Sequence, residues 1–293
     1  MRILLILAAF AAAYPCLSKV GLYLLLDLRQ RRQKPDPGSG TGRRWRRALM
    51  FRAREIGVTY ASLGHGALHR LSRARRLTAV RPQSHPERPP ILLVHGYGMS
   101  AGQLRPLTRW LEKVIARDGW CLDWGSLTTD LERAVPRLAA LAARAAAAHP
   151  GQRLDIVAHS LGGLLVARAL PRMEEAGVRV GTFLAVATPF HGTEPGAWSV
   201  GPGRRWLQPG SRCLSELRAE LAARLGADLT IICLYSLDDE MIQPAHSCRL
   251  SWPGAFNVPV LDIGHHDLLF HPAGRREIAR LLMGASAESR RPR

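Results

Sequence analysis

The chain has 293 residues, enough for one large or two small domains, and 47% of them are hydrophobic, which excludes an intrinsically disordered protein. It carries 41 basic against 23 acidic residues, a net charge of +18, and almost all of the basic residues are arginine. Such a charge suits an anionic membrane or a nucleic acid. No aromatic stacking platform or known RNA-binding motif accompanies the arginines, so we expect no nucleic-acid partner.

Residues 1–28 form a hydrophobic segment that we interpret as a membrane anchor or a signal segment. Residues 3–26 are apolar apart from Ser18 and Lys19, which is close to the ~20 residues that cross a bilayer. We favour an uncleaved hydrophobic helix, in the inner membrane of a bacterium. The alternatives are a cleaved signal peptide, with Arg2 as its charged start and 11–13 as its cleavage site, and a buried core helix.

The side of the membrane is left open by the same segment. Basic residues follow the apolar stretch at 29, 31, 32 and 34, and only Arg2 precedes it. The positive-inside bias would keep the catalytic part in the cytoplasm. A cleaved signal peptide would instead export it.

Residues 29–88 are predicted to be a basic linker and helical arm. The stretch 35–42 (PDPGSGTG) is a flexible break, and arginines then surround Trp45, Leu49 and Phe51. This pattern indicates one or two basic amphipathic helices. They either lie on an anionic membrane surface or pack on the domain with a solvated arginine face.

From residue 89 to 284 short apolar runs alternate with longer helical segments, which predicts an α/β domain with a mostly parallel sheet flanked by helices. We expect a helix over 130–148, with Pro136 kinking it or lying in its first turn. The expected strands, continuous apolar runs typical of strands buried on both faces, are 91–94, 154–158, 181–187, 229–235 and 258–263.

The segment 155–163 (DIVAHSLGG) predicts a nucleophile elbow. A strand runs into a small-x-Ser-x-Gly turn and then into a helix, an arrangement that exposes the hydroxyl of Ser160. Ala158 stands where glycine is usual and is small enough for the turn. Gly162 and Gly163 supply the other small residues of the turn, and His159 precedes the serine as a supporting residue.

The segment 91–98 (ILLVHGYG) is a strand that ends in His95-Gly96 and a second glycine loop. In an elbow enzyme this loop supplies one main-chain N–H of the oxyanion hole. The Tyr97 N–H is the best candidate, with the Leu161 N–H as its partner donor. An ordinary turn is the alternative interpretation, and His95 is a candidate general base.

An acidic group follows the predicted strand 229–235. An orienting carboxylate belongs at such a strand end, and Asp238, Asp239 and Glu240 all compete for the role.

The general base should follow the acid in chain order. The strand-Gly-His context selects His265, and His266 is its rival.

Five cysteines show neither a CxxC pair nor metal-ligand spacing, and Cys213 and Cys248 are able to pair if the protein is exported. No metal or other cofactor is expected.

Five segments, taken together, resemble the bacterial lipase and esterase branch of the α/β-hydrolase family. AHSLGG is similar to its elbow, TPFHGT (188–193) to its TPHxGT segment and QPGSRCL (208–214) to its Q-x-P-G-S-x-x-L stretch. DEMIQP (239–244) resembles the D-x-x-V-x-P acid loop, and GHHDLL (264–269) resembles GHxxLL. The resemblance implies an α/β-hydrolase fold over about 89–284 without a cofactor. It assigns the acid to Asp239 and the base to His265.

We therefore expect a serine lipase or carboxylesterase that acts on a hydrophobic ester or lipid substrate through a Ser160–Asp239–His265 triad. The alternatives are an acyltransferase on the same fold and a non-catalytic membrane scaffold. Residues 192–227 are expected to form a lid-like insert, with a plain connection as the alternative, and residues 285–293 a basic tail.

Overall fold

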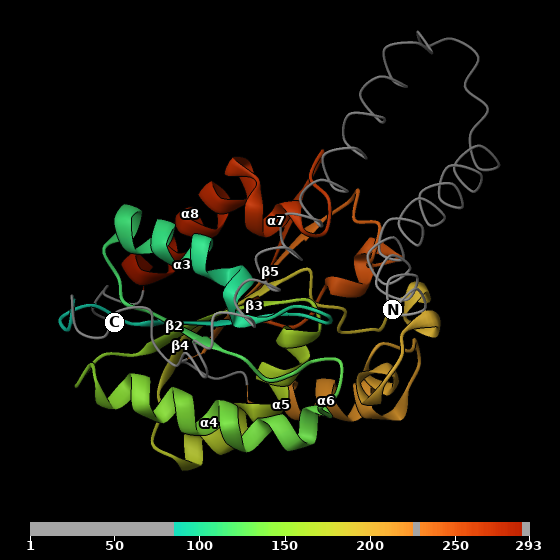
Figure 1. Ribbon diagram of the computed structural model, residues 1–293, viewed down its shortest axis with the longest axis horizontal. Helices are drawn as coiled ribbons and strands as arrows, with labels where there is room; N and C mark the ends of the chain where they lie inside the picture. Colours follow the sequence, from blue (N-terminus) through green and yellow to red (C-terminus); the bar gives the residue numbers. More distant parts are fainter. Residues whose placement is uncertain (1–84, 225–228, 289–293) are drawn as a thin grey trace, which may run out of the picture.

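The computed structural model describes residues 85–224 and 229–288, and its centre is a six-stranded parallel sheet with the strand order β2-β1-β3-β4-β5-β6 (Figure 1). β1, β2 and β3 are buried along their whole length, as continuous apolar strands should be when helices cover both faces. The strands are β1 (Ile91–Val94), β2 (Gly119–Leu122), β3 (Leu154–His159), β4 (Val180–Val186), β5 (Thr230–Ser236) and β6 (Ala255–Val260).

Helices cover both faces of the sheet (Figure 1). One face carries α3 (Ala101–Ile115), α7 (Asp267–Phe270) and α8 (Pro272–Glu288). The other carries α4 (Leu131–Ala147), α5 (Leu161–Glu175) and α6 (Arg212–Ala222). Three short 3-10 helices complete the described elements: η1 (Glu194–Trp198), η2 (Pro202–Trp206) and η3 (Ala245–Cys248).

The sheet separates two hydrophobic cores. Leu92 and Val94 point from β1 into the core beneath α4 and α5, whereas Ile91 and Leu93 point into the core beneath α3 and α8. This alternation follows from the period of two in a strand. Burying one such side chain contributes ~1.5–3 kcal/mol to the free energy of folding. The helices packed on both faces therefore hold the sheet and the ends of its strands in place.

Local signals explain two of the helix starts. Asp130 caps α4, where its Oδ1 accepts the Glu132 N–H at 3.0 Å, and Ser100 with Gln103 forms a capping box at α3. Pro136 lies inside α4 beyond its first turn, which leaves the α4 ladder without one N–H donor.

The predicted α/β class, with a mostly parallel sheet flanked by helices, is confirmed, with corrections to individual elements. β6 begins three residues before the predicted 258–263, because it is an edge strand whose residues are only partly buried. β2 and α3 were not predicted. α8 extends to Glu288, so the predicted 285–293 tail begins as helix.

The anchor or signal segment (1–28), the arm up to residue 84 and residues 289–293 lie outside the described residues. Within 85–224 and 229–288, no helix combines the length and the apolar character needed to cross a bilayer.

Candidate active site

Four strand ends bring together the residues that the sequence analysis selected. His95 and Gly96 follow β1, Ser160 follows β3, Asp239 follows β5 and His265 follows β6. Because the strands are parallel, their carboxyl ends lie along one edge of the sheet, where open α/β sheets bind their ligands.

Ser160 forms a strained corner between β3 and α5. Its φ and ψ are 54° and −128°, in a region that costs a non-glycine residue ~1–3 kcal/mol. Two main-chain bonds hold the corner: the Ser160 N–H donates to Val186 O at 2.8 Å, and the Gly163 N–H donates to Ser160 O at 2.9 Å. The serine therefore caps a helix whose first N–H groups lack intrahelical acceptors.

Two glycines let the loop after β1 and the start of α5 approach this corner. A Cβ on Gly162 would lie 2.4 Å from His95 O and 2.8 Å from Val94 O. A Cβ on Gly96 would lie 2.8 Å from the Ser160 Cβ. Any side chain at either position would push the nucleophile away from the loop after β1.

Asp239 and His265 form a buried pair. The His265 Nδ1–H donates to Asp239 Oδ2 at 2.8 Å, and the two residues are 3% and 1% exposed, respectively. Asp239 Oδ1 accepts the N–H groups of Met241 and Ile242, both at 2.8 Å, which fixes the carboxylate. With its proton held on Nδ1, the ring presents the lone pair of Nε2, as a general base requires.

The neighbouring carboxylates bind the main chain of the base loop. Asp238 Oδ2 accepts the Asp262 N–H at 2.8 Å, and Glu240 Oε2 accepts the His265 N–H at 3.1 Å. The three competing carboxylates thus serve one loop, and Asp239 is the one that binds the imidazole ring. The sequence did not predict the contact between Glu240 and His265. In the sequence Glu240 stood out only as a neighbour of Asp239 that competed for the same role.

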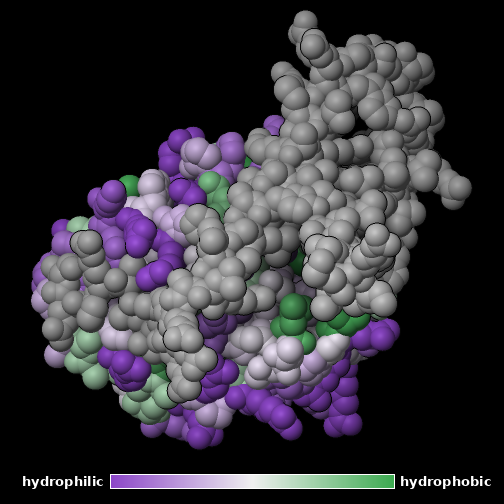
Figure 2. Space-filling view, viewed as in Figure 1, coloured by the Kyte–Doolittle hydropathy of each residue, from purple (hydrophilic) through white to green (hydrophobic). Residues whose placement is uncertain are grey.

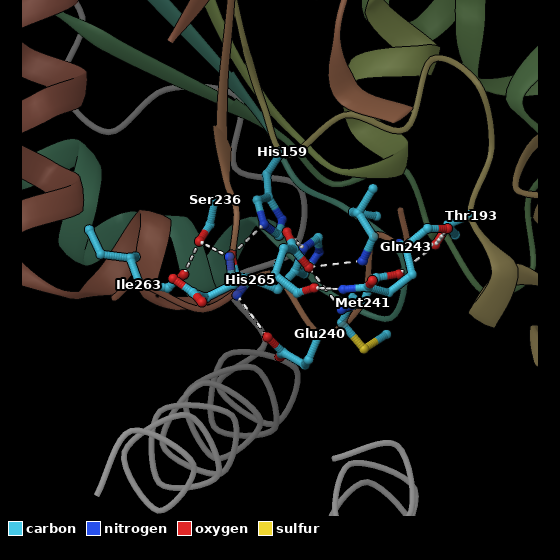
Figure 3. Close-up of polar contacts among 11 residues, drawn as sticks. His159, Thr193, Ser236, Glu240, Met241, Gln243, Ile263 and His265 are labelled. Atoms are coloured by element: carbon cyan, nitrogen blue, oxygen red, sulfur yellow. Dashed lines mark hydrogen bonds and ion pairs between the residues drawn. The ribbon is translucent and has the colours of Figure 1, made fainter. Parts of the chain in front are cut away.

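His159 supports His265 from the side of the nucleophile. Its Nε2–H donates to His265 O at 3.1 Å, and the two ring centroids are 4.5 Å apart (Figure 3). The amide, the carbonyl and the ring of His265 are therefore each held by a different residue. His266, the rival base, contacts the His265 ring edge-on with centroids 5.3 Å apart.

His95, the first residue after β1, is fully buried. Its ring stacks on Trp124 with centroids 5.7 Å apart, its Nδ1–H donates to Gly96 O at 3.0 Å, and the Trp124 Nε1–H donates to His95 O at 3.0 Å. These contacts favour a supporting role for His95 over its interpretation as a general base.

The two expected oxyanion donors approach Ser160 from different elements. Leu161 is the first residue of α5, so its N–H belongs to the group that lacks intrahelical acceptors. Tyr97 follows Gly96, which abuts Ser160. The half-buried Tyr97 side chain also reaches the segment 192–207 through its hydroxyl, a contact that nothing in the sequence indicated.

The cysteines are all free among the described residues, so a Cys213–Cys248 disulfide is not formed in this structure. Burial raises the pKa of the Cys121 and Cys233 thiols to about 12, and burial together with nearby Asp239 holds the pKa of Cys248 well above its ordinary value. Within 85–224 and 229–288, no group of three or more His, Cys, Asp or Glu residues could hold a metal ion.

Comparison with protein families matches residues 131–227 to the family described as "Putative serine esterase (DUF676)". The matched stretch runs from α4 through the Ser160 corner to the end of the 192–227 segment. Among curated proteins, no sequence matches this chain significantly.

Solved lipases and esterases share the fold at low sequence identity. The mature form of the Bacillus licheniformis lipase BlEst2 is 16% identical, covering 72% of this chain and 98% of its own, with a TM-score of 0.57. EstE7, an HSL homologue from a metagenome library, is 16% identical over 82% of this chain and 98% of its own, with a TM-score of 0.57. Aspergillus fumigatus lipase B is 20% identical, and the match covers 64% of this chain and 50% of the lipase, with a TM-score of 0.54.

Proposed function

We propose that this chain, which has the α/β-hydrolase fold, is a serine hydrolase that cleaves carboxylic esters of hydrophobic acyl groups through an acyl-enzyme on Ser160. One observation supports the proposal: His159, which precedes the strained corner of Ser160, contacts the ring of His265, and His265 pairs with Asp239 in the interior. The match of residues 131–227 to a serine esterase family supports the same chemistry.

In the acylation step, His265 Nε2 takes the proton of the Ser160 hydroxyl, and Oγ attacks the ester carbonyl carbon. The carbonyl oxygen becomes an oxyanion and accepts the N–H groups of Tyr97 and Leu161. Asp239 holds the ring through Nδ1 and stabilises the imidazolium. The carbon–oxygen bond to the alcohol then breaks, and Nε2–H gives its proton to the departing alkoxide.

Deacylation repeats these steps with water. His265 Nε2 takes a proton from the water, whose oxygen attacks the acyl carbon of the Ser160 ester. When the second tetrahedral intermediate collapses, Ser160 Oγ leaves and recovers the proton from Nε2. The acid product departs and the starting enzyme is restored.

The hydrophobic substrate class is supported from two sides. Several of the similar structures are lipases or esterases by name, and one is a monoacylglycerol lipase from Paleococcus ferrophilus. In this chain Val200 is 67% exposed and Leu127 is 43% exposed, and Val200 is bonded to Tyr97 beside the proposed oxyanion hole. These side chains offer apolar contact to an acyl group near the reacting carbonyl.

Substituting Ser160 tests the proposal. We expect Ser160→Ala to lower kcat on p-nitrophenyl butyrate by roughly 10⁴–10⁶-fold without changing the thermal unfolding midpoint by more than a few degrees. Activity of the variant equal to that of the wild type would refute the mechanism. Product analysis with glycerol or a lysophospholipid added separates hydrolysis from acyl transfer: free fatty acid as the main product supports the proposal, whereas acylated acceptor supports a transferase.

We also propose that residues 1–28 attach the protein to a membrane, which rests on the apolar run at 3–26 alone. Fractionation of the tagged full chain tests it. The chain should sediment with membranes and resist extraction at high salt, and a chain released by salt would contradict the proposal.

A further inference from the structure

We infer that the Tyr97 side chain is a positioning element of the oxyanion hole, because its hydroxyl bonds the loop after β1 to the insert at Val200. The inference rests on the proposed function and adds a structural condition to it. The Tyr97 N–H points correctly only while the insert, defined here as residues 192–207, is docked.

The bond between Tyr97 and Val200 is reciprocal. The Tyr97 hydroxyl donates to Val200 O at 2.7 Å and accepts the Val200 N–H at 2.9 Å, across 103 residues of sequence. One hydroxyl that satisfies both main-chain groups of one residue fixes the position of the half-buried ring as well as its rotation. The main chain of Tyr97 is thereby tied to a second element.

The insert is anchored at its other end to the acid loop. Thr193 Oγ1 donates to Met241 O at 2.8 Å and accepts the Gln243 N–H at 2.8 Å (Figure 3). The Thr193 N–H in turn donates to Leu207 O at 2.8 Å, which closes the insert on itself. Val200 therefore sits on a segment held by the loop that carries Asp239.

The insert also packs directly on both proposed oxyanion donors. A Cβ built on Gly203, in η2, would lie 3.0 Å from Leu161 Cδ2 and 3.9 Å from Tyr97 Cδ2. Trp206 at the end of η2 is 3% exposed, so its side chain anchors the segment in the core, while Arg204 and Arg205 beside it are exposed.

The exposed rim of the insert lies beside these contacts. Val200 is 67% exposed and bonds Tyr97 through its main chain alone. On the coloured part of the face drawn in Figure 2, hydrophobic and hydrophilic residues are interspersed. The Val200 side chain is thus available for substitution without disturbing the core.

Removing the Tyr97 hydroxyl should therefore misdirect one oxyanion donor without deleting it. Loss of a whole donor costs ~10²–10³-fold in rate, and a misplacement near 1 Å costs up to ~10²-fold. We expect Tyr97→Phe to lower kcat by ~5–50-fold with little change in KM.

Two matched comparisons isolate the bond. Tyr235→Phe makes the same chemical change in the other tyrosine of the described residues, at the end of β5, and should leave kcat unchanged.

Val200→Pro removes the N–H group that the Tyr97 hydroxyl accepts, whereas Val200→Ala keeps it. The extended backbone of Ser199, with φ −68° and ψ 150°, is compatible with a following proline. We expect Val200→Pro to lose more kcat than Val200→Ala, and to add little to the loss in Tyr97→Phe.

The deciding readout compares two inhibitors of the wild type and the variants. An alkyl trifluoromethyl ketone forms a tetrahedral adduct whose oxyanion needs the donors, and an alkyl ether of equal length does not. The affinity of Tyr97→Phe for the ketone should fall by the same factor as kcat/KM, and its affinity for the ether should stay within twofold of the wild type.

Four outcomes decide the inference. It is supported by a selective loss for the ketone. It is overturned by a Tyr97→Phe enzyme with kcat within twofold of the wild type, or by equal losses for ketone and ether. A wild type that neither turns over esters nor reacts at Ser160 overturns the proposed function and this inference together. If Val200→Pro does not fold, Tyr97→Phe alone decides.

Discussion

Gly162→Ala tests whether the approach of α5 to β1 builds the active site. The added Cβ would lie 2.4 Å from His95 O, 2.8 Å from Val94 O and 3.0 Å from His95 C, and ordinary contact begins near 3.4 Å. All three atoms are main-chain atoms, so no side chain can turn aside. The start of α5 must move by about 1 Å relative to the loop after β1, as overpacking in a close-packed site forces backbone shifts.

The size of the effect follows from that displacement. Overpacking costs ~1–3 kcal/mol, which lowers the unfolding midpoint of a domain of this size by roughly 2–12 °C. Moving the Leu161 N–H by ~1 Å from the reacting carbonyl should lower kcat by ~10²-fold. Thermal unfolding and ester hydrolysis measure the two effects on one preparation.

Gly284→Ala is the matched control. Nothing lies within 4 Å of a Cβ at this position in α8, so the same substitution should stabilise the protein by up to ~1 kcal/mol and leave kcat unchanged. A Gly162→Ala protein with the midpoint and kcat of the wild type would refute the reasoning, because the close approach would then constrain neither stability nor catalysis.

Three further predictions concern stability and reactivity. Thr188 is 1% exposed and its Oγ1 has no hydrogen-bond partner among the described residues, so Thr188→Val should raise the free energy of unfolding by up to ~1 kcal/mol in urea titrations. Arg117 Nη2 donates to Asp155 Oδ2 at 2.5 Å in the interior, and Arg117→Leu should cost ~3–5 kcal/mol because it leaves a buried carboxylate unpaired. Half-buried Cys213 should react with iodoacetamide at pH 8 at least ~10²-fold faster than the three buried thiols whose pKa is raised, as mass spectrometry of the native protein can show. Those thiols are Cys121, Cys233 and Cys248.

Each of these has an outcome that would count against it. A Thr188→Val protein less stable than the wild type would mean that the hydroxyl is hydrogen-bonded after all. Adding Asp155→Asn to Arg117→Leu should recover part of the lost stability, and no recovery would contradict the charge argument. Early alkylation of Cys233 would show that β5 opens to solvent in the native state.

The sequence predicted the central strands well because they are buried on both faces. β1 is a run of apolar residues, β3 is apolar apart from Asp155 and its last residue, His159, and the structure places both within one residue of the prediction. β2 was missed because its four residues, GWCL, give too short a pattern to recognise. The predicted bounds of β6 were displaced by three residues, because this edge strand pairs with a neighbour on one side only, is partly exposed and need not be continuously apolar.

The residues of the candidate site were selected from strand ends and motif order, but their supporting contacts were not. Ser160, Asp239 and His265 each follow a strand, and this local context is visible in the sequence. The bond between Tyr97 and Val200 joins residues 103 positions apart, through main-chain groups of one partner. No side-chain pattern records such a contact, because any residue other than proline provides the same N–H and C=O.

Reaction of the full chain with a fluorophosphonate probe, followed by peptide mass spectrometry, tests the central claim most directly. The account predicts one adduct on the peptide that contains Ser160, absent in Ser160→Ala and formed much more slowly in Asp239→Asn, whose amide cannot stabilise the imidazolium of His265. A wild type without an adduct, or an adduct that persists in Ser160→Ala, would contradict it.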